Sequence, residues 1–268
     1  MKEAALLARF TLHELFRTPA MLVLMAMAFL INIAALVVSN LYLLELSKVQ
    51  IDVLWTGTSI LALAYVLFIA TTLLAGDIAG QVAYLFLPKL NRQQYLLGRF
   101  AGLALGLVAL MSLTAFVSGG FLAWTIAHTA VSYHAGASIW AGLQLAAMAS
   151  LQGMTLLAAI LFIASWATGQ AETLVFSIGF TLLAYLLPPV VAAMQSHEVL
   201  ERVPPAVAAS MHIVDYILPD MTAGNMALAI AHGFKVSTHD IWLLIGQHGG
   251  YSLMMLAFAL MAFARRDL

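Results

Sequence analysis

Long apolar stretches alternate with short polar segments along the whole chain. Six stretches of about 20 or more residues contain no Asp, Glu, Lys or Arg, and they cover residues 20–39, 53–76, 100–126, 139–167, 173–194 and 241–264. A helix rises about 1.5 Å per residue, so roughly 20 apolar residues cross a hydrocarbon core of about 30 Å. The pattern predicts an all-α polytopic membrane protein with six transmembrane helices.

The composition supports this interpretation. Apolar residues make up 63% of the 268 residues and charged residues 9%, whereas soluble proteins carry roughly 45–50% and about 25%. So few charges cannot cover a water-facing surface, which excludes a soluble enzyme and a disordered chain. The net charge of −1 provides no basic face for nucleic acid, and the absence of cysteine excludes disulfides and thiolate metal sites. We expect one transmembrane domain over residues 1–268.

The N-terminal residues 1–19 are predicted to form an amphipathic helix at the membrane surface. Its polar face would carry Lys2, Arg9, His13 and Arg17, and the opposite face would carry Leu7, Ala8 and Leu15. Charged and apolar faces on one helix are typical of interfacial helices. A plain solvated leader helix is the alternative.

The distribution of positive charge predicts the orientation. With the N-terminus inside, eight of the 11 Lys and Arg residues fall on cytoplasmic segments, which agrees with the positive-inside rule. Both termini and the segment 77–99 would then be cytoplasmic. The long link over residues 195–240 would be extracytoplasmic, and we expect short helices over residues 207–218 and 225–232 to dip into the outer leaflet.

Small residues recur at helical spacing inside two of the predicted spans. Gly98, Gly102 and Gly106 form a tandem G-x-x-x-G, and Ser138, Gly142, Ala146 and Ser150 repeat the spacing in the next span. Such residues let helix backbones approach closely in membranes. They indicate either static helix packing or a sliding contact.

Few residues in the spans offer chemistry. No nucleotide-binding G-x-x-x-x-G-K-[ST] loop, H-E-x-x-H or G-x-S-x-G motif occurs, so the chain has no visible motor or hydrolytic site of its own. Four polar residues within the apolar windows could line a pathway or simply bond neighbouring helices: Asn32, Gln144, Gln152 and His248. Six outer-side histidines suggest a metal site, but their spacing matches no ligand motif, so no metal residues are predicted.

The second-to-third link resembles a known family. It contains Asp77-Ile-Ala-Gly80, an apolar block, Pro88, Arg92 and then Tyr95-Leu-Leu-Gly98-Arg99. This order resembles the type-2 ATP-binding cassette exporter permeases, in which an acidic residue and a glycine precede a Pro-x-x-Arg block. Here Pro88 precedes Arg92 by four positions rather than three, and Arg99 stands where lysine is more usual.

The resemblance implies a non-catalytic transport subunit in the bacterial inner (plasma) membrane. Two copies would pair as a homodimer and bind two separate ATPase subunits, which would hold the ATP and magnesium; no cofactor is expected on this chain. The segment 77–99 would contain the coupling helix. Its expected ATPase-coupling residues are Asp77, Gly80, Tyr84, Leu85, Phe86, Pro88, Lys89, Arg92 and Tyr95.

Two other functions stay open. The chain could be a membrane accessory subunit that couples a partner ATPase to a periplasmic protein or maturation factor, with residues 195–240 as the docking surface. It could also be an intramembrane enzyme that uses the outer-side histidines. Co-purification with an ATPase would favour the first two functions over the enzyme.

Overall fold

The structure is a computed structural model that describes residues 2–42, 46–79, 90–129, 138–194 and 224–265, together with the single residues 204, 219 and 221. Every regular element in these ranges is a helix, which confirms the predicted fold class. The helix predicted over residues 207–218 lies outside the described residues.

Six helical segments are long and apolar enough to cross a membrane. They are α2 (Pro19–Ser39), α3–η1–α4 (Leu46–Ala64, Tyr65–Ala70, Thr71–Ala79), α6 (Arg92–His128), α7 (Ala141–Trp166), α8 (Gln170–Met194) and α12 (Thr238–Arg265). Each contains or closely overlaps one of the predicted windows. The chain is a multi-pass membrane protein.

Two spans begin seven or more residues before their charge-free windows. The second span starts at Leu46 and includes Lys48 and Asp52, and the third starts at Arg92 rather than at residue 100. A capping box begins α6, because the Asn91 side chain bonds the backbone at Gln94 and Gln94 bonds the Asn91 amide. Charged residues at helix ends are therefore part of the helices but outside the apolar windows.

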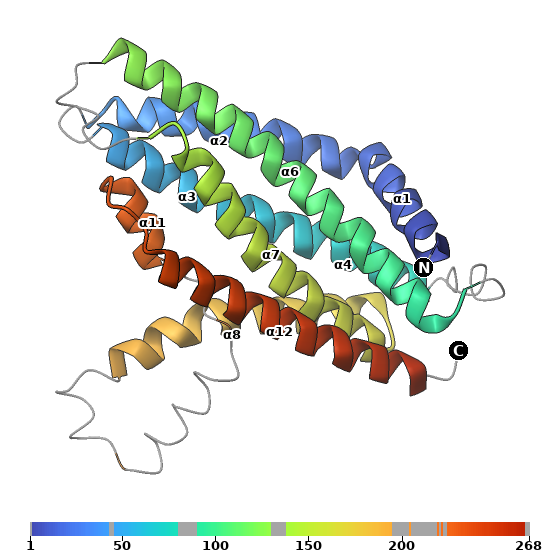
Figure 1. Cartoon of the computed structure of the whole chain (residues 1–268). Coiled ribbons are helices and arrows are strands. Elements are labelled where there is room, and N and C mark those ends of the chain that lie inside the picture. Colours follow the sequence, from blue (N-terminus) through green and yellow to red (C-terminus); the bar gives the residue numbers. More distant parts are fainter. Residues whose placement is uncertain are drawn as a thin grey trace.

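The helices form one bundle around α7, the most buried of the spans (Figure 1). It packs against α12, α6 and α3. In contrast, most residues of α2, α8 and α12 are not fully buried, and the exposed ones include large apolar side chains such as Leu186 and Leu253. Phe116 on α6 is 83% exposed. Such a surface suits contact with lipid rather than with water.

The N-terminal helix α1 (Lys2–Arg17) has the predicted amphipathic faces. Leu7, Ala8 and Leu15 are buried, whereas Arg9, His13 and Arg17 are exposed; the side chain of Lys2 lies outside the description. The apolar face packs along the first half of α6, and Figure 1 shows the two helices side by side. The helix is therefore attached to the bundle along its length.

The tandem glycines of α6 form the surface on which α1 lies. A Cβ placed on Gly98 would come within 2.9 Å of the Ala4 carbonyl oxygen, and one on Gly102 within 2.5 Å of Thr11 Cβ. At Gly106 it would meet the Tyr65 hydroxyl oxygen at 2.5 Å. The predicted close packing is confirmed, and its partners are α1 and the second span.

On the opposite side of the bundle, α11 (Gly224–Ala231) confirms the short helix predicted over residues 225–232. It ends before Gly233, whose φ of 71° lies in the left-handed region that glycine adopts without strain. The helix packs against α3 and α7.

Replacing Gly102 with leucine should detach α1 from α6, because the new side chain would overlap Thr11 and the Ala8 backbone. Overpacking of this kind costs about 1–3 kcal/mol, which thermal unfolding in detergent would detect. Gly120→Leu on the same helix is the matched control, since nothing lies within 4 Å of a Cβ there. Equal unfolding temperatures for the two variants would contradict this packing.

Candidate functional site: a buried arginine at the end of the bundle

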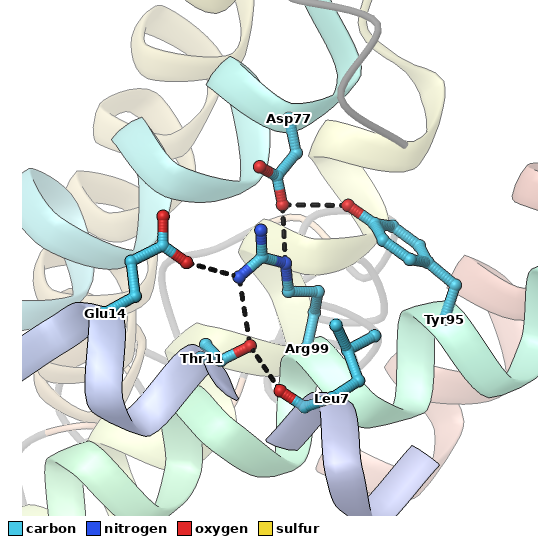
Figure 2. A network of polar contacts seen from close by, with 6 residues as sticks. All are labelled: Leu7, Thr11, Glu14, Asp77, Tyr95 and Arg99. Atoms are coloured by element: carbon cyan, nitrogen blue, oxygen red, sulfur yellow. Dashed lines mark hydrogen bonds and ion pairs between the residues drawn. The ribbon is translucent and has the colours of Figure 1, made fainter. Parts of the chain in front are cut away.

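A single arginine joins three helices at the end of the bundle where the chain termini lie (Figures 1 and 2). Arg99 on α6 is only 2% exposed. Its Nε lies 2.6 Å from Oδ2 of Asp77 at the end of α4, and its Nη1 lies 2.7 Å from Oε2 of Glu14 on α1. Nη1 also donates to the hydroxyl of Thr11 at 3.0 Å.

Further contacts extend this network. The Tyr95 hydroxyl donates to Asp77 Oδ2 at 2.8 Å, and the Thr11 hydroxyl donates to the Leu7 carbonyl at 3.0 Å. The Tyr95 ring stacks on Phe263 of α12, with 6.2 Å between the centroids. The network therefore reaches α12 as well as α1, α4 and α6.

Because these charged groups are buried, each needs a partner of opposite charge at close distance. Removing a guanidinium from water costs several kcal/mol unless carboxylates and hydrogen bonds replace the lost solvation. Asp77 is nearly as buried as Arg99, whereas the Glu14 side chain is 33% exposed. The guanidinium carbon Cζ of Arg99 lies over the Phe10 ring, 6.0 Å from the ring centroid, which adds a cation–π contact. The arrangement fixes the relative positions of three helices more than it adds stability.

Two of the predicted coupling residues belong to this network. Asp77 and Tyr95 are buried, and both already bond to partners within the chain. Their side chains therefore hold the two ends of the segment 77–99 together instead of pointing outward. Any part they take in coupling would pass through the helices that they join.

A third predicted coupling residue lies close by. Arg92, in the first turn of α6, donates from Nη1 to the Ala264 carbonyl at 3.1 Å and so ties the start of α6 to the end of α12. The other predicted coupling residues lie outside the described residues: Gly80, Tyr84, Leu85, Phe86, Pro88 and Lys89.

The sequence did not single out Glu14 or Thr11 and gave Arg99 no role of its own. The available signal was Arg99 itself, a permanent cation at the edge of an apolar window. A buried cation requires a carboxylate, but several acidic residues lie at this end of the predicted topology. Spacing alone could not select Glu14, which is 85 residues away in the chain.

The four predicted pathway residues are not brought together by hydrogen bonds in the described part of the chain. Asn32 donates to the Ala28 carbonyl of its own helix at 2.8 Å, and Gln144 is exposed. Gln152 donates to the Met221 carbonyl at 2.7 Å, and the Nδ1 of His248 lies 2.9 Å from the Thr155 hydroxyl. For Gln152 and His248 these bonds match the packing alternative, in which polar groups join neighbouring segments.

The outer-side histidines form no metal cluster among the residues that the structure describes. His128 bonds the Trp124 carbonyl through its ring Nδ1 at 2.8 Å and stacks on the Trp124 ring. His232 stacks on Phe234.

Compared with known proteins, the chain matches no family model and no curated protein.

Replacing Arg99 with methionine should destabilise the protein by about 3–5 kcal/mol, because Asp77 would remain buried without its cation. Denaturant titration in mixed micelles would measure the loss. The double variant Arg99→Met with Asp77→Leu should recover part of it, since both buried charges are then removed. A double variant no more stable than Arg99→Met alone would show that the ion pair does not hold these helices together.

Proposed function

We propose that the chain is the transmembrane permease subunit of an ATP-driven exporter. In this proposal two copies form a dimer in the bacterial inner membrane, with both termini in the cytoplasm, and each copy binds an ATPase subunit. ATP and magnesium would reside on that partner. The resemblance of the segment 77–99 to exporter permeases supports the proposal, as does the lack of a nucleotide-binding motif in the chain.

The observation that carries the proposal is the position of the Arg99 network at the base of the segment 77–99. Asp77 is the first residue of this segment and Arg99 is the last. Their side chains form an ion pair, with 2.6 Å between Arg99 Nε and Asp77 Oδ2. A force applied to the segment by a partner would therefore act on α4 and α6 together. Glu14 and Phe263 extend the connection to α1 and α12.

A second contact joins the second and third spans deeper in the bundle. The Tyr65 hydroxyl donates to the Leu103 carbonyl at 2.7 Å, one turn beyond Arg99 on α6. Tyr65 begins η1, a π-helical turn that interrupts the second span, and such turns occur frequently at functional sites. The second and third spans are thus held at two levels, which suits rigid transmission of a tilt from the cytoplasmic end.

The proposal predicts which ends of the bundle face the cytoplasm. The chain has no native cysteine, so a maleimide can label only the single cysteine that is introduced. A membrane-impermeant maleimide should label Lys235→Cys in intact cells but label Gln93→Cys only after permeabilisation; both positions are exposed. The reverse pattern would place the segment 77–99 outside and contradict the coupling role.

Affinity purification of the tagged chain from its native membranes tests the partner directly. We expect an ATPase subunit in the eluate, with ATP hydrolysis that depends on the complex. Recovery of a soluble periplasmic protein bound to residues 195–240 would favour the accessory subunit instead. Purification without any nucleotide-hydrolysing partner would contradict both functions.

The double variant Pro88→Ala with Arg92→Ala should abolish the stimulation of ATP hydrolysis while leaving membrane insertion intact. Hydrolysis should fall to the rate of the ATPase alone, because the segment would no longer seat on its partner. Arg17→Ala is the control, since Arg17 is exposed at the end of α1 and outside this segment. Unchanged stimulation in the double variant would argue against coupling through residues 77–99.

A further inference from the structure

A lateral groove lies between α7 and α12, near the end of the bundle that carries the termini. Its volume is about 370 Å³, within the range of roughly 300–1,000 Å³ typical of ligand clefts. It is lined by Phe162, Phe258, Met261, Ala262 and Arg265. The Phe162 and Phe258 rings contact each other at a tilt, with 6.0 Å between centroids, and form an aromatic wall.

The groove combines this apolar wall with one positive charge. Arg265 is exposed in the last turn of α12, and no ion pair joins it to any residue that the structure describes. Among the described residues, no acidic side chain lines the groove. A bound molecule would therefore meet apolar side chains along α12 and a guanidinium at the helix end.

The level of the groove relative to the bilayer follows from its neighbours. Trp166, which is 65% exposed, lies one turn beyond Phe162 at the end of α7. Tryptophan is enriched at the boundary between hydrocarbon and headgroups. Arg265 ends the last apolar span, so its guanidinium lies at headgroup depth and Phe258 lies about two turns deeper, among the acyl chains.

We propose that this groove binds an anionic phospholipid. Its phosphate would contact the Arg265 guanidinium, and one acyl chain would lie against Phe162, Phe258 and Met261. A basic residue between helix ends at the membrane boundary suits anionic headgroups, and the charge distinguishes this site from the wholly apolar groove between α2 and α6. The proposal does not depend on transport or on an ATPase partner.

Photocrosslinking in vesicles tests the site on the full chain. The protein is reconstituted in phosphatidylcholine that contains a trace of phosphatidylglycerol or of phosphatidylcholine with a diazirine on the acyl chain. Trypsin releases residues 236–265 as one peptide, because no Lys or Arg interrupts it. We expect adducts at residues 258–262, with phosphatidylglycerol clearly exceeding phosphatidylcholine.

Two variants separate the headgroup from the acyl chain. Arg265→Gln should lower the phosphatidylglycerol adducts about fivefold, which corresponds to about 1 kcal/mol for one Arg near the surface, and should leave phosphatidylcholine adducts unchanged. Met261→Trp should fill the groove and lower both. Arg17→Gln removes an exposed charge on α1 and should change neither.

Three results would overturn the proposal. Equal labelling by the two lipids would show an apolar surface without headgroup selection. An equal loss in Arg17→Gln would show general attraction to the membrane surface. Absence of adducts at residues 258–262 with either lipid would show that another protein surface, such as a second copy of the chain, covers the groove.

Discussion

The structure depends on the solvation of one buried cation. A guanidinium stays charged at physiological pH, so Arg99 can be buried only where carboxylates and hydroxyls replace water. Asp77, Glu14 and Thr11 meet this requirement from two other helices. The positions of α1, α4 and α6 at this end of the bundle are therefore set together, and a displacement of one helix would leave a charge without its partner.

The glycines of α6 make this arrangement possible. Lipid provides little hydrophobic drive for helix association, so close backbone packing has to supply it. Gly98 and Gly102 allow α1 to lie directly on α6. This close packing brings Glu14 and Thr11 of α1 within hydrogen-bond distance of Arg99. The amphipathic helix α1 is thereby made part of the bundle, while Arg9, His13 and Arg17 stay exposed.

Hydrophobic patterning predicted the spans and the buried face of α1, because the period of apolar residues directly reflects which side leaves water. It placed the starts of the second and third spans seven or more residues too late, since Asp52 and Arg99 lie within the helices but carry a charge. The spacing of the glycines indicated close packing without naming the partner. The ion pairs of Arg99 could not be predicted, because Asp77 and Glu14 reach it through tertiary packing that no local period encodes.

The polar residues within the spans bear on where a substrate could pass. Gln152 and His248 bond neighbouring segments, and Asn32 bonds its own helix, so these side chains line no shared polar route among the described residues. The bundle around α7 is packed with small and branched apolar residues, as in Ala158, Ala159 and Ile160. Under the proposed function, a route would therefore lie between two copies rather than within one. The network at Arg99 would suit that geometry, because it joins α1, α4 and α6, so that these helices would move together.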